Sequence, residues 1–272
     1  MGTLDPIAQN LTTTDSTSDT PSEAFRVADE RIPLFFDPTT TFRPNPTTSL
    51  VYGSVVINPG ETGIDMGAGI GPGSIYLAKF AATHDNLRHI YSIEAVPEQV
   101  ELLAKNVKFH GLEDKIAPQY GRFFSPMGDQ RVDFIVSDIS GMNGVGVPLG
   151  WYPSNIPLGG TDGADNAVYV AQEAPRYLNQ ENSNARLYFP IVVQFSDGDR
   201  IQKAAQKHFS QVKKVAEKDI PLMEEQLKII ERWVAEDPAN NRTFAPFKER
   251  GATRKLWTLE VYEAKNPIYD SN

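Results

Sequence analysis

The sequence predicts an α/β protein with a mostly parallel seven-stranded sheet, helices on both faces and an antiparallel last strand. Strand-like apolar runs alternate with helical runs between Ile64 and Val193, an order that produces a parallel sheet. A glycine-rich turn, Gly67–Gly73, joins the first run to the first helix. The last run, Lys255–Tyr262, alternates apolar and polar residues as a half-buried antiparallel strand does.

The composition bounds the function. With 272 residues, of which 40% are hydrophobic, the chain can bury one α/β core and an appendage. The absence of cysteine excludes disulfides, thiolate metal sites and a cysteine nucleophile. The 4 histidines lack metal-ligand spacing, so we expect no metal. The net charge of -9 argues against a nucleic-acid partner, because binding to phosphates needs a basic surface.

The start of the chain differs in amino-acid composition from the rest. Residues 1–30 are rich in Ser, Thr and Asp, which predicts a disordered or lid-like tail without the features of a secretory signal. Residues 31–57 form a proline-rich N-terminal extension in which Thr47–Ser49 resemble a helix cap. No apolar run approaches the ~20 residues of a membrane span. We therefore expect a cytoplasmic protein that does not contact a membrane.

Residues 58–265 form the predicted catalytic domain. Its first half continues with a strand, His89–Glu94, a helix from Pro97 to Gly111, and strands at Lys115–Tyr120 and Val132–Asp138. The second half contains further expected elements: a glycine- and proline-rich substrate loop at 139–161, a helix at Asp162–Tyr177, a strand at Arg186–Val193, a helix at Arg200–Phe209 and an inserted helix within 220–238.

The glycine turn limits the choice of ligand. A phosphate-binding loop would place a lysine after its last glycine, and Ser74 follows here. A dinucleotide fingerprint would place a third glycine or alanine where Pro72 or Ser74 stands, which weakens a nicotinamide-dependent oxidoreductase without removing it. The pattern that remains is an acid followed by alternating glycines, made of Asp65, Gly67, Ala68, Gly69 and Gly71.

This pattern resembles the first motif of the Rossmann-like class I methyltransferases that use S-adenosylmethionine (SAM). The resemblance implies that the glycine turn passes under the amino-acid end of SAM and that Asp65 helps to orient it. Glu94 ends the second strand, where its carboxylate can accept both ribose hydroxyls. At the third strand the family usually carries an acid that binds the adenine amine, and Gly121-Arg122-Phe123 stand there instead. Arg122 and Phe123 or Phe124 are therefore the expected adenine contacts.

A narrower resemblance concerns the acceptor. The run Phe42-Arg43-Pro44-x-x-Thr47-Thr48 and the segment Pro157–Gly163 look like those of small-domain methyltransferases that include the release-factor glutamine N-methyltransferases. Those enzymes end the fourth strand in Asn-Pro-Pro-Tyr, and this chain has Asp138-Ile139-Ser140-Gly141. The resemblance places Asp138 beside both cofactor and acceptor, and Phe42 and Thr47 on the acceptor side, with Trp151 and Tyr152 as pocket walls.

The aspartate changes the expected chemistry. Ionised aspartate only accepts hydrogen bonds, whereas asparagine also donates them. Asp138 therefore suits an acceptor rich in N–H or O–H groups, and can take its proton. We expect an enzyme that moves a methyl group from SAM to an amine, hydroxyl or carboxyl group of a small molecule or peptide, as in specialised metabolism. The alternatives are a protein side-chain N-methyltransferase, the oxidoreductase above, or a SAM-binding module without catalysis.

Overall fold

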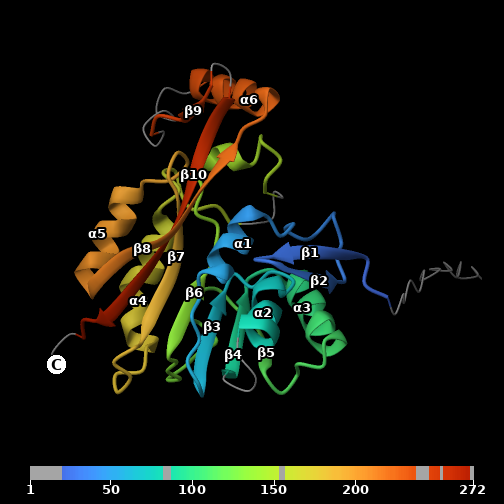
Figure 1. The fold of residues 1–272 in the computed structure, drawn as a ribbon, viewed down its shortest axis with the longest axis vertical. Helices are drawn as coiled ribbons and strands as arrows, with labels where there is room; N and C mark the ends of the chain where they lie inside the picture. Colours follow the sequence, from blue (N-terminus) through green and yellow to red (C-terminus); the bar gives the residue numbers. More distant parts are fainter. Residues whose placement is uncertain (1–19, 82–86, 153–156, 237–244, 252–253, 270–272) are drawn as a thin grey trace, which may run out of the picture.

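The computed structural model describes residues 20–81, 87–152, 157–236, 245–251 and 254–269 (Figure 1). One twisted sheet runs through the molecule with helices on both of its faces, and a narrow arm rises from one side of it. In the described part of the chain, no helix is long and apolar enough to cross a membrane.

The main sheet confirms the predicted fold class. Its strands follow the order β5-β4-β3-β6-β7-β10-β8, and the short β9 pairs with β10 in addition. Five central strands are parallel to one another: β3 (Glu61–Met66), β4 (Leu87–Glu94), β5 (Ile116–Tyr120), β6 (Phe134–Ser137) and β7 (Arg186–Val192). The last strand, β10 (Arg254–Pro267), is antiparallel to β7, as its alternating pattern predicted.

Helices cover the two faces of the sheet as two groups. On one face lie α1 (Pro46–Gly53), α2 (Pro72–Tyr76, extended by a π-helical turn at Leu77–Ala81) and α3 (Pro97–Phe109). On the other lie α4 (Asp165–Tyr177) and α5 (Gly198–His208). Successive β6 residues alternate between the two cores, with Phe134 in the first and Ile135 in the second, because strand side chains point to opposite faces.

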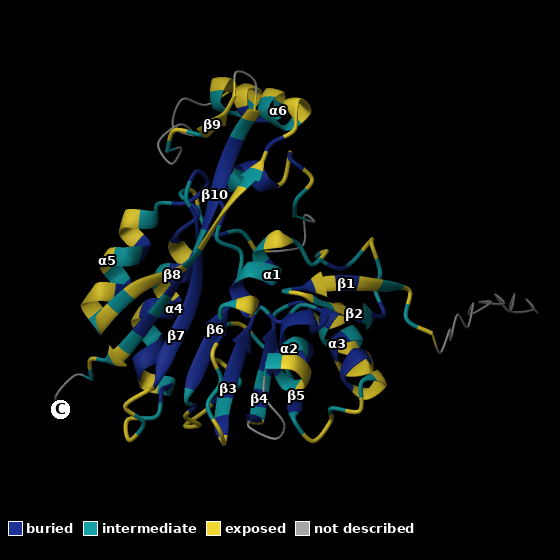
Figure 2. Ribbon diagram, in the orientation of Figure 1, coloured by how far each residue is buried: buried dark blue, intermediate teal, exposed yellow. Residues whose placement is uncertain are grey.

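The N-terminal part differs from the predicted tail. Residues Glu23–Val27 (β1) pair in antiparallel fashion with Glu30–Leu34 (β2), outside the main sheet. Phe25 and Val27 are buried, while their neighbours face outward (Figure 2). The apolar positions are few but alternate, and this suffices for a hairpin against the domain. Residues 1–19 of the predicted tail lie outside the described residues.

A second difference is the edge strand β8 (Phe209–Pro221), for which the sequence predicted no strand. Most of its residues are exposed and many are charged. Its charges are paired: Lys214 with Glu217 in the same strand and with Glu260 of β10, and Glu217 and Asp219 with Lys248 of β9 (Lys248–Arg250). An exposed edge strand has no buried face to give an apolar alternation, so the pattern did not reveal it.

The arm is made of the far ends of β8 and β10 together with β9 and α6 (Glu224–Glu236). Helix α6 lies within the insert expected at 220–238. A third apolar cluster joins the arm to the segment after β6, and its buried members are Met142, Val145, Leu149, Val192, Phe195, Leu222, Ile230, Trp257 and Leu259. The arm and this segment therefore pack as one unit over the carboxyl end of β7.

Candidate active site

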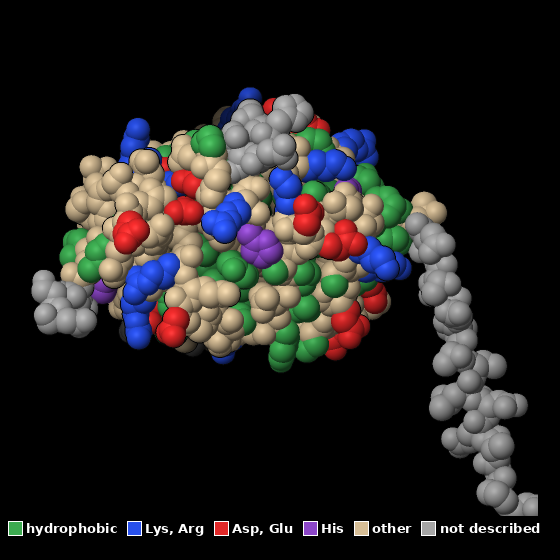
Figure 3. Space-filling model, turned by 90° about the horizontal axis from the view of Figure 1, so that it is seen from below, with side chains coloured by type: hydrophobic (Ala, Val, Ile, Leu, Met, Phe, Trp, Pro, Cys, Tyr) green, Lys and Arg blue, Asp and Glu red, His purple; other side chains and the backbone are tan. Residues whose placement is uncertain are grey.

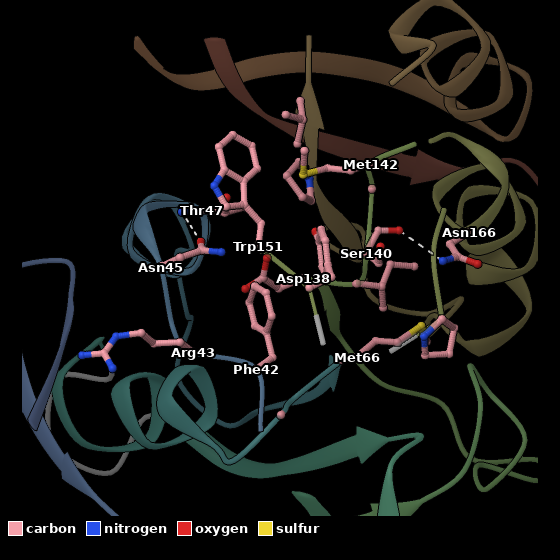
Figure 4. A pocket seen from close by; sticks show the side chains of 18 of the residues that line it. Phe42, Arg43, Asn45, Thr47, Met66, Asp138, Ser140, Met142, Trp151 and Asn166 are labelled. Carbon is pink, nitrogen blue, oxygen red and sulfur yellow. Dashed lines mark hydrogen bonds between the residues drawn. The ribbon is translucent and has the colours of Figure 1, made fainter. Parts of the chain in front are cut away.

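A cavity of about 430 Å³ opens at the carboxyl ends of β3, β4 and β6 (Figure 4). Its volume is within the ~300–1,000 Å³ range of small-ligand pockets. Most of its exposed lining is apolar. The predicted site residues that line it are Phe42, Thr47, Gly67, Gly69, Glu94, Arg122, Phe123, Asp138, Trp151 and Tyr152.

The glycine turn forms one end of the cavity. Gly67 and Gly69 have positive φ values of 78° and 55°. A Cβ at Gly67 would lie 2.9 Å from the Ile139 Cγ2 atom and 3.0 Å from the Asp138 carbonyl oxygen, so no side chain fits there. The turn is held against the end of β4 by the Gly67 and Ala68 amides, which donate to the Ile93 carbonyl. Its backbone is thereby fixed in place at the cavity floor.

Glu94 occupies the next strand end, as predicted. Its Oε2 accepts from the Gly69 amide at 2.9 Å, and its Oε1 accepts from the Ala95 and Val96 amides at 2.7 and 2.9 Å. Burial raises the pKa of this carboxyl group, while the three amides oppose that change. Glu94 thus fixes the turn and still has lone pairs for a ligand.

Three predicted cofactor contacts do not line the cavity: Asp65, Ala68 and Gly71. Asp65 is fully buried beneath the turn, where it accepts hydrogen bonds from the hydroxyls of Tyr52 and Ser74. Burial raises its pKa to about 6, against these hydrogen bonds. In this structure Asp65 therefore joins α1, β3 and α2 rather than facing a ligand.

The opposite side of the cofactor end is made by Gly121, Arg122 and Phe123. Phe123 has a positive φ of 52°, and its ring packs on Tyr169 with centroids 4.5 Å apart. The Arg122 guanidinium lies over the Phe123 ring at 5.0 Å. Phe124, the alternative adenine contact, stacks instead on Tyr177 in the core. Phe123 is thus the aromatic residue that the third strand end offers to the cavity.

Asp138 lies where the two ends of the cavity meet. Its amide donates to the Met66 carbonyl at 3.0 Å, and its Oδ2 accepts from Thr48 Oγ1 at 2.9 Å. The residue is only partly buried because it faces the cavity. Burial nevertheless raises its pKa to about 7, Thr48 opposes this change, and the charge of Asp65 adds to it. Asp138 can therefore exchange a proton near neutral pH.

Aromatic rings line the far half of the cavity. Phe42 stacks on Tyr152 with centroids 5.2 Å apart, and Trp151 lies 5.7 Å from Trp257. In Figure 4 the Phe42 and Trp151 side chains lie on either side of Asp138. Burial raises the pKa of Tyr152 to about 12, so its phenol stays neutral. Thr47 lies at the start of α1, where its amide donates to the Asn45 side chain at 2.7 Å.

Sequence reasoning missed several lining residues. Asn45, rather than Thr47–Ser49, caps α1. Other missed lining residues are Gln99, Ser140, Met142, Asn166, Ile220, Gln226 and Trp257. Gln99 carried a signal, since a polar residue stood among the apolar positions of the helix that follows Glu94. Trp257 carried none, because its strand predicted only core packing.

One buried polar atom at the cavity, Gln99 Nε2, has no hydrogen-bond partner among the described residues. Buried groups of this kind are costly unless a ligand or water meets them. The Ser140 side chain interacts with Tyr152 by a hydrogen bond, which lowers the pKa of that phenol against the effect of burial. Gln99 therefore offers a donor at the cofactor end, and Ser140 offers a hydroxyl at the acceptor end.

These features fit SAM at the cofactor end. The free lone pairs of Glu94 suit ribose hydroxyls, the Gln99 donor is available, and the bare backbone at Gly67 and Gly69 permits close approach. No group of three or more His, Cys, Asp or Glu residues that could hold a metal occurs within the described ranges.

Comparisons with known proteins give the same assignment. Residues 53–139 match the TRM5/TYW2 methyltransferase domain. The ribosomal protein uL3 glutamine methyltransferase of Bradyrhizobium diazoefficiens is 28% identical over 134 residues, which are 47% of this chain and 41% of that protein. The release factor glutamine methyltransferase of Geobacter sulfurreducens is 31% identical over 124 residues, 43% of this chain and 41% of that protein. The chain thus spans about two fifths of the length of these curated relatives.

The fold has solved counterparts as well. The tRNA m1G37 methyltransferase of M. jannaschii superposes with a TM-score of 0.51 at 16% identity, over 89% of this chain and 56% of that one. At this identity the likeness concerns the fold alone. The match over residues 53–139 confirms the expected methyltransferase domain there, and the superposition confirms its Rossmann-like fold.

Proposed function

We propose that the protein transfers the methyl group of SAM to an amine, hydroxyl or carboxyl group of a small molecule or peptide. The observation that carries this proposal is the place of Asp138. Its backbone lies beside Met66 and Gly67 of the glycine turn, its carboxylate accepts from Thr48, and the residue lines the cavity together with the aromatic rings. A group bound there on the aromatic side would face the cofactor end directly.

The chain's own residues divide the work. When bound, SAM supplies a methyl group already activated by its sulfonium. Glu94, Gln99 and the turn hold the cofactor, while the rings and Asp138 hold the acceptor in line with it. Such positioning can supply roughly 7–11 kcal/mol of rate enhancement. Asp138 orients the acceptor through its hydrogen atoms and accepts the proton that the acceptor loses.

A second candidate is methylation of a protein side chain. It is favoured by the two sequence relatives, which are named as glutamine methyltransferases of a ribosomal protein and a release factor. Against it stands the replacement of asparagine by Asp138, because a carboxylate cannot donate to the carbonyl oxygen of a glutamine amide.

The M. jannaschii tRNA m1G37 methyltransferase is named for a tRNA acceptor. The charges of this chain give less support to such an acceptor. The net charge is -9. On the face seen in Figure 3, acidic side chains are interspersed with the basic ones over the described residues. Along the edge of the sheet, Lys214 of β8 and Lys248 of β9 are paired with acidic side chains. Neutralising a phosphate backbone needs a basic surface.

The test is Asp138→Ala, with the exposed Asp129→Ala as control. SAM binding is measured by calorimetric titration, and turnover by transfer of a labelled methyl group to the acceptor. We expect Asp138→Ala to bind SAM with unchanged affinity and to lose ~10²-fold or more in kcat, as removal of a general base does. Unchanged turnover would leave Asp138 with the structural task of holding Thr48.

Protonation of Asp138 gives a separate prediction. Its pKa near 7 means that the proton-accepting carboxylate forms as the pH rises. Turnover of an acceptor that must lose a proton should therefore increase from pH 6 to pH 8, whereas a residual activity of Asp138→Asn should lack this step. A fall in wild-type rate over the same range would contradict the assigned role.

A further inference from the structure

The acceptor half of the cavity carries a negative charge that no nearby positive charge of the described lining offsets. Its described lining contains one ionisable acid, Asp138, and one base, Arg43. The Arg43 side chain turns away from the cavity (Figure 4) and lies over the rings of Phe25 and Phe36, where it also pairs with Glu23. No positive charge of the described lining therefore offsets the charge of Asp138 in this half.

The walls around this carboxylate suit a flat apolar body. Trp151 and Trp257 lie with centroids 5.7 Å apart at an interplanar angle of 40°, and the stacked pair Phe42 and Tyr152 forms another wall. Tyr152 adds no charge, because burial raises its pKa to about 12. Aromatic faces attract cations and pack against flat rings.

These walls are held from behind. Trp151 contacts Phe195 edge-on with centroids 5.5 Å apart, and Trp257, which is 7% exposed, belongs to the third apolar cluster. Ile220 and Gln226 bring the arm to the same cavity. Residues that are packed on one side and face a cavity on the other keep a defined shape. The arm thus sets the form of the acceptor half.

From this combination we propose that the acceptor is a small amine with a flat apolar body. Its nitrogen lies at Asp138 and Ser140, and its body packs against the aromatic wall that Trp151 and Trp257 form. This inference rests on the proposed methyl transfer and names the acceptor class within it.

The chemistry balances with the residues present. The amine binds as an ammonium ion beside the Asp138 carboxylate, and the buried Ser140 hydroxyl can accept one of its hydrogens. The ammonium first gives a proton to Asp138, which frees the nitrogen lone pair. A bond then forms between this nitrogen and the methyl carbon, while the electrons of the broken carbon–sulfur bond stay on sulfur. The product is again an ammonium ion.

The rival acceptor groups fit this half less well. A carboxylate would face Asp138 as a like charge, which costs free energy in a partly buried site. An alcohol can donate to Asp138 but has no charge to pair with it or with the ring faces. An amine can form an ion pair with the carboxylate, donate a hydrogen bond to the hydroxyl and contact the rings as a cation.

The experiment uses the full chain and four matched compounds: phenethylamine, 2-phenylethanol, 3-phenylpropanoate and propylamine. Labelled methyl transfer from SAM gives kcat/KM for each, and titration into protein loaded with S-adenosylhomocysteine gives each affinity. We expect phenethylamine to exceed the alcohol, the acid and the ring-free propylamine at least tenfold in either measurement. A preference for the alcohol or the acid, or failure of phenethylamine to bind, overturns the inference.

Variants separate the two parts of the site. Asp138→Asn should weaken phenethylamine binding at least tenfold and leave 2-phenylethanol binding within about twofold. Trp257→Ala should weaken phenethylamine and leave propylamine unchanged, and Trp257→Phe, which keeps a ring and the fold, should retain most of the affinity. Equal losses for all compounds would contradict the amine assignment. If SAM itself does not bind the wild-type protein, the proposed methyl transfer fails, whereas intact SAM binding with another preferred acceptor refutes only the amine.

Discussion

The two halves of the cavity are built in different ways. The cofactor half comes from consecutive strand ends, with Gly67 and Gly69 after β3, Glu94 at the end of β4 and Gln99 in the following helix α3. The acceptor half draws side chains from the extension before α1, the segment after β6, and the arm. One half depends on local turns, and the other depends on how distant segments pack.

This difference teaches where specificity can change. Backbone and strand-end contacts follow from the fold, so they are fixed wherever the fold is kept. The walls made by Trp151 and Trp257 depend on the arm and can change without disturbing the turn. Helix α1 connects the two halves, because Thr48 binds Asp138 and Tyr52 binds Asp65.

The largest effect on the cofactor half should come from Glu94→Ala. The change removes the acceptor of three backbone amides and the proposed acceptor of the ribose hydroxyls. Hydrogen bonds to a charged group contribute about 1.5–3 kcal/mol, which corresponds to a roughly 10- to 100-fold weaker Kd for SAM in calorimetric titration.

The exposed neighbour Glu98 provides the matched control, and Glu98→Ala should bind SAM normally. The near-ultraviolet circular dichroism of Glu94→Ala should keep the signal of Trp151 and Trp257, because the acceptor half is built separately. A normal SAM affinity would show that Glu94 only holds the turn, and a lost tryptophan signal would break the distinction between the halves.

The sequence predicted the cofactor half because its residues are close in the chain to patterned elements. A strand that ends in Glu94 and a turn with Gly67 and Gly69 need only the rule that parallel strands end at one edge. Asp65 shows the limit of this reasoning. The motif marks it as a strand-end acid, but its side chain points beneath the turn toward Tyr52, and only the packing of α1 decides that.

The acceptor half and the arm were less predictable. The strands β8 and β10 run beyond the sheet and bring the arm to the cavity, which Ile220, Gln226 and Trp257 line. No local sequence pattern predicts how far two paired strands extend. The exposed, charged β8 gave no apolar alternation, so it was missed. Trp151, Tyr152 and Phe42 were predicted on the acceptor side, but the contacts of Trp151 with Trp257 and of Tyr152 with Phe42 follow only from packing.

A medium effect should come from Tyr52→Phe, which tests the connection through α1. The variant removes one hydrogen bond to the buried Asp65 carboxyl group. This bond lowers the pKa of Asp65, so it stabilises the fold mainly while Asp65 is ionised, above its pKa of about 6. We expect the free energy of unfolding to fall by about 1–3 kcal/mol at pH 8 and by clearly less at pH 5, in urea titrations.

The exposed Tyr120→Phe serves as its control and should change neither value. Burial alone acts in the opposite direction on Asp65, since a raised carboxyl pKa removes stability as the pH rises from about 4 to 6. A loss for Tyr52→Phe that is equal at pH 5 and pH 8 would mean that the hydroxyl contributes by packing and not through the charge of Asp65.

The smallest effect, and the sharpest for the cofactor half, should come from Gln99→Leu. Gln99 is 1% exposed and its Nε2 has no partner among the described residues, so the unbound protein carries a buried, unpaired donor. Replacing it with leucine should raise the free energy of unfolding of the unbound protein by about 1 kcal/mol. The same change should weaken SAM binding roughly three- to tenfold, since one hydrogen bond is lost.

Thermal unfolding with and without SAM measures both effects on one sample. A gain in stability with unchanged SAM affinity would mean that Glu94 and the backbone, and not Gln99, bind the cofactor. A gain in stability together with weaker SAM binding would mean that Gln99 binds the cofactor and destabilises the unbound protein.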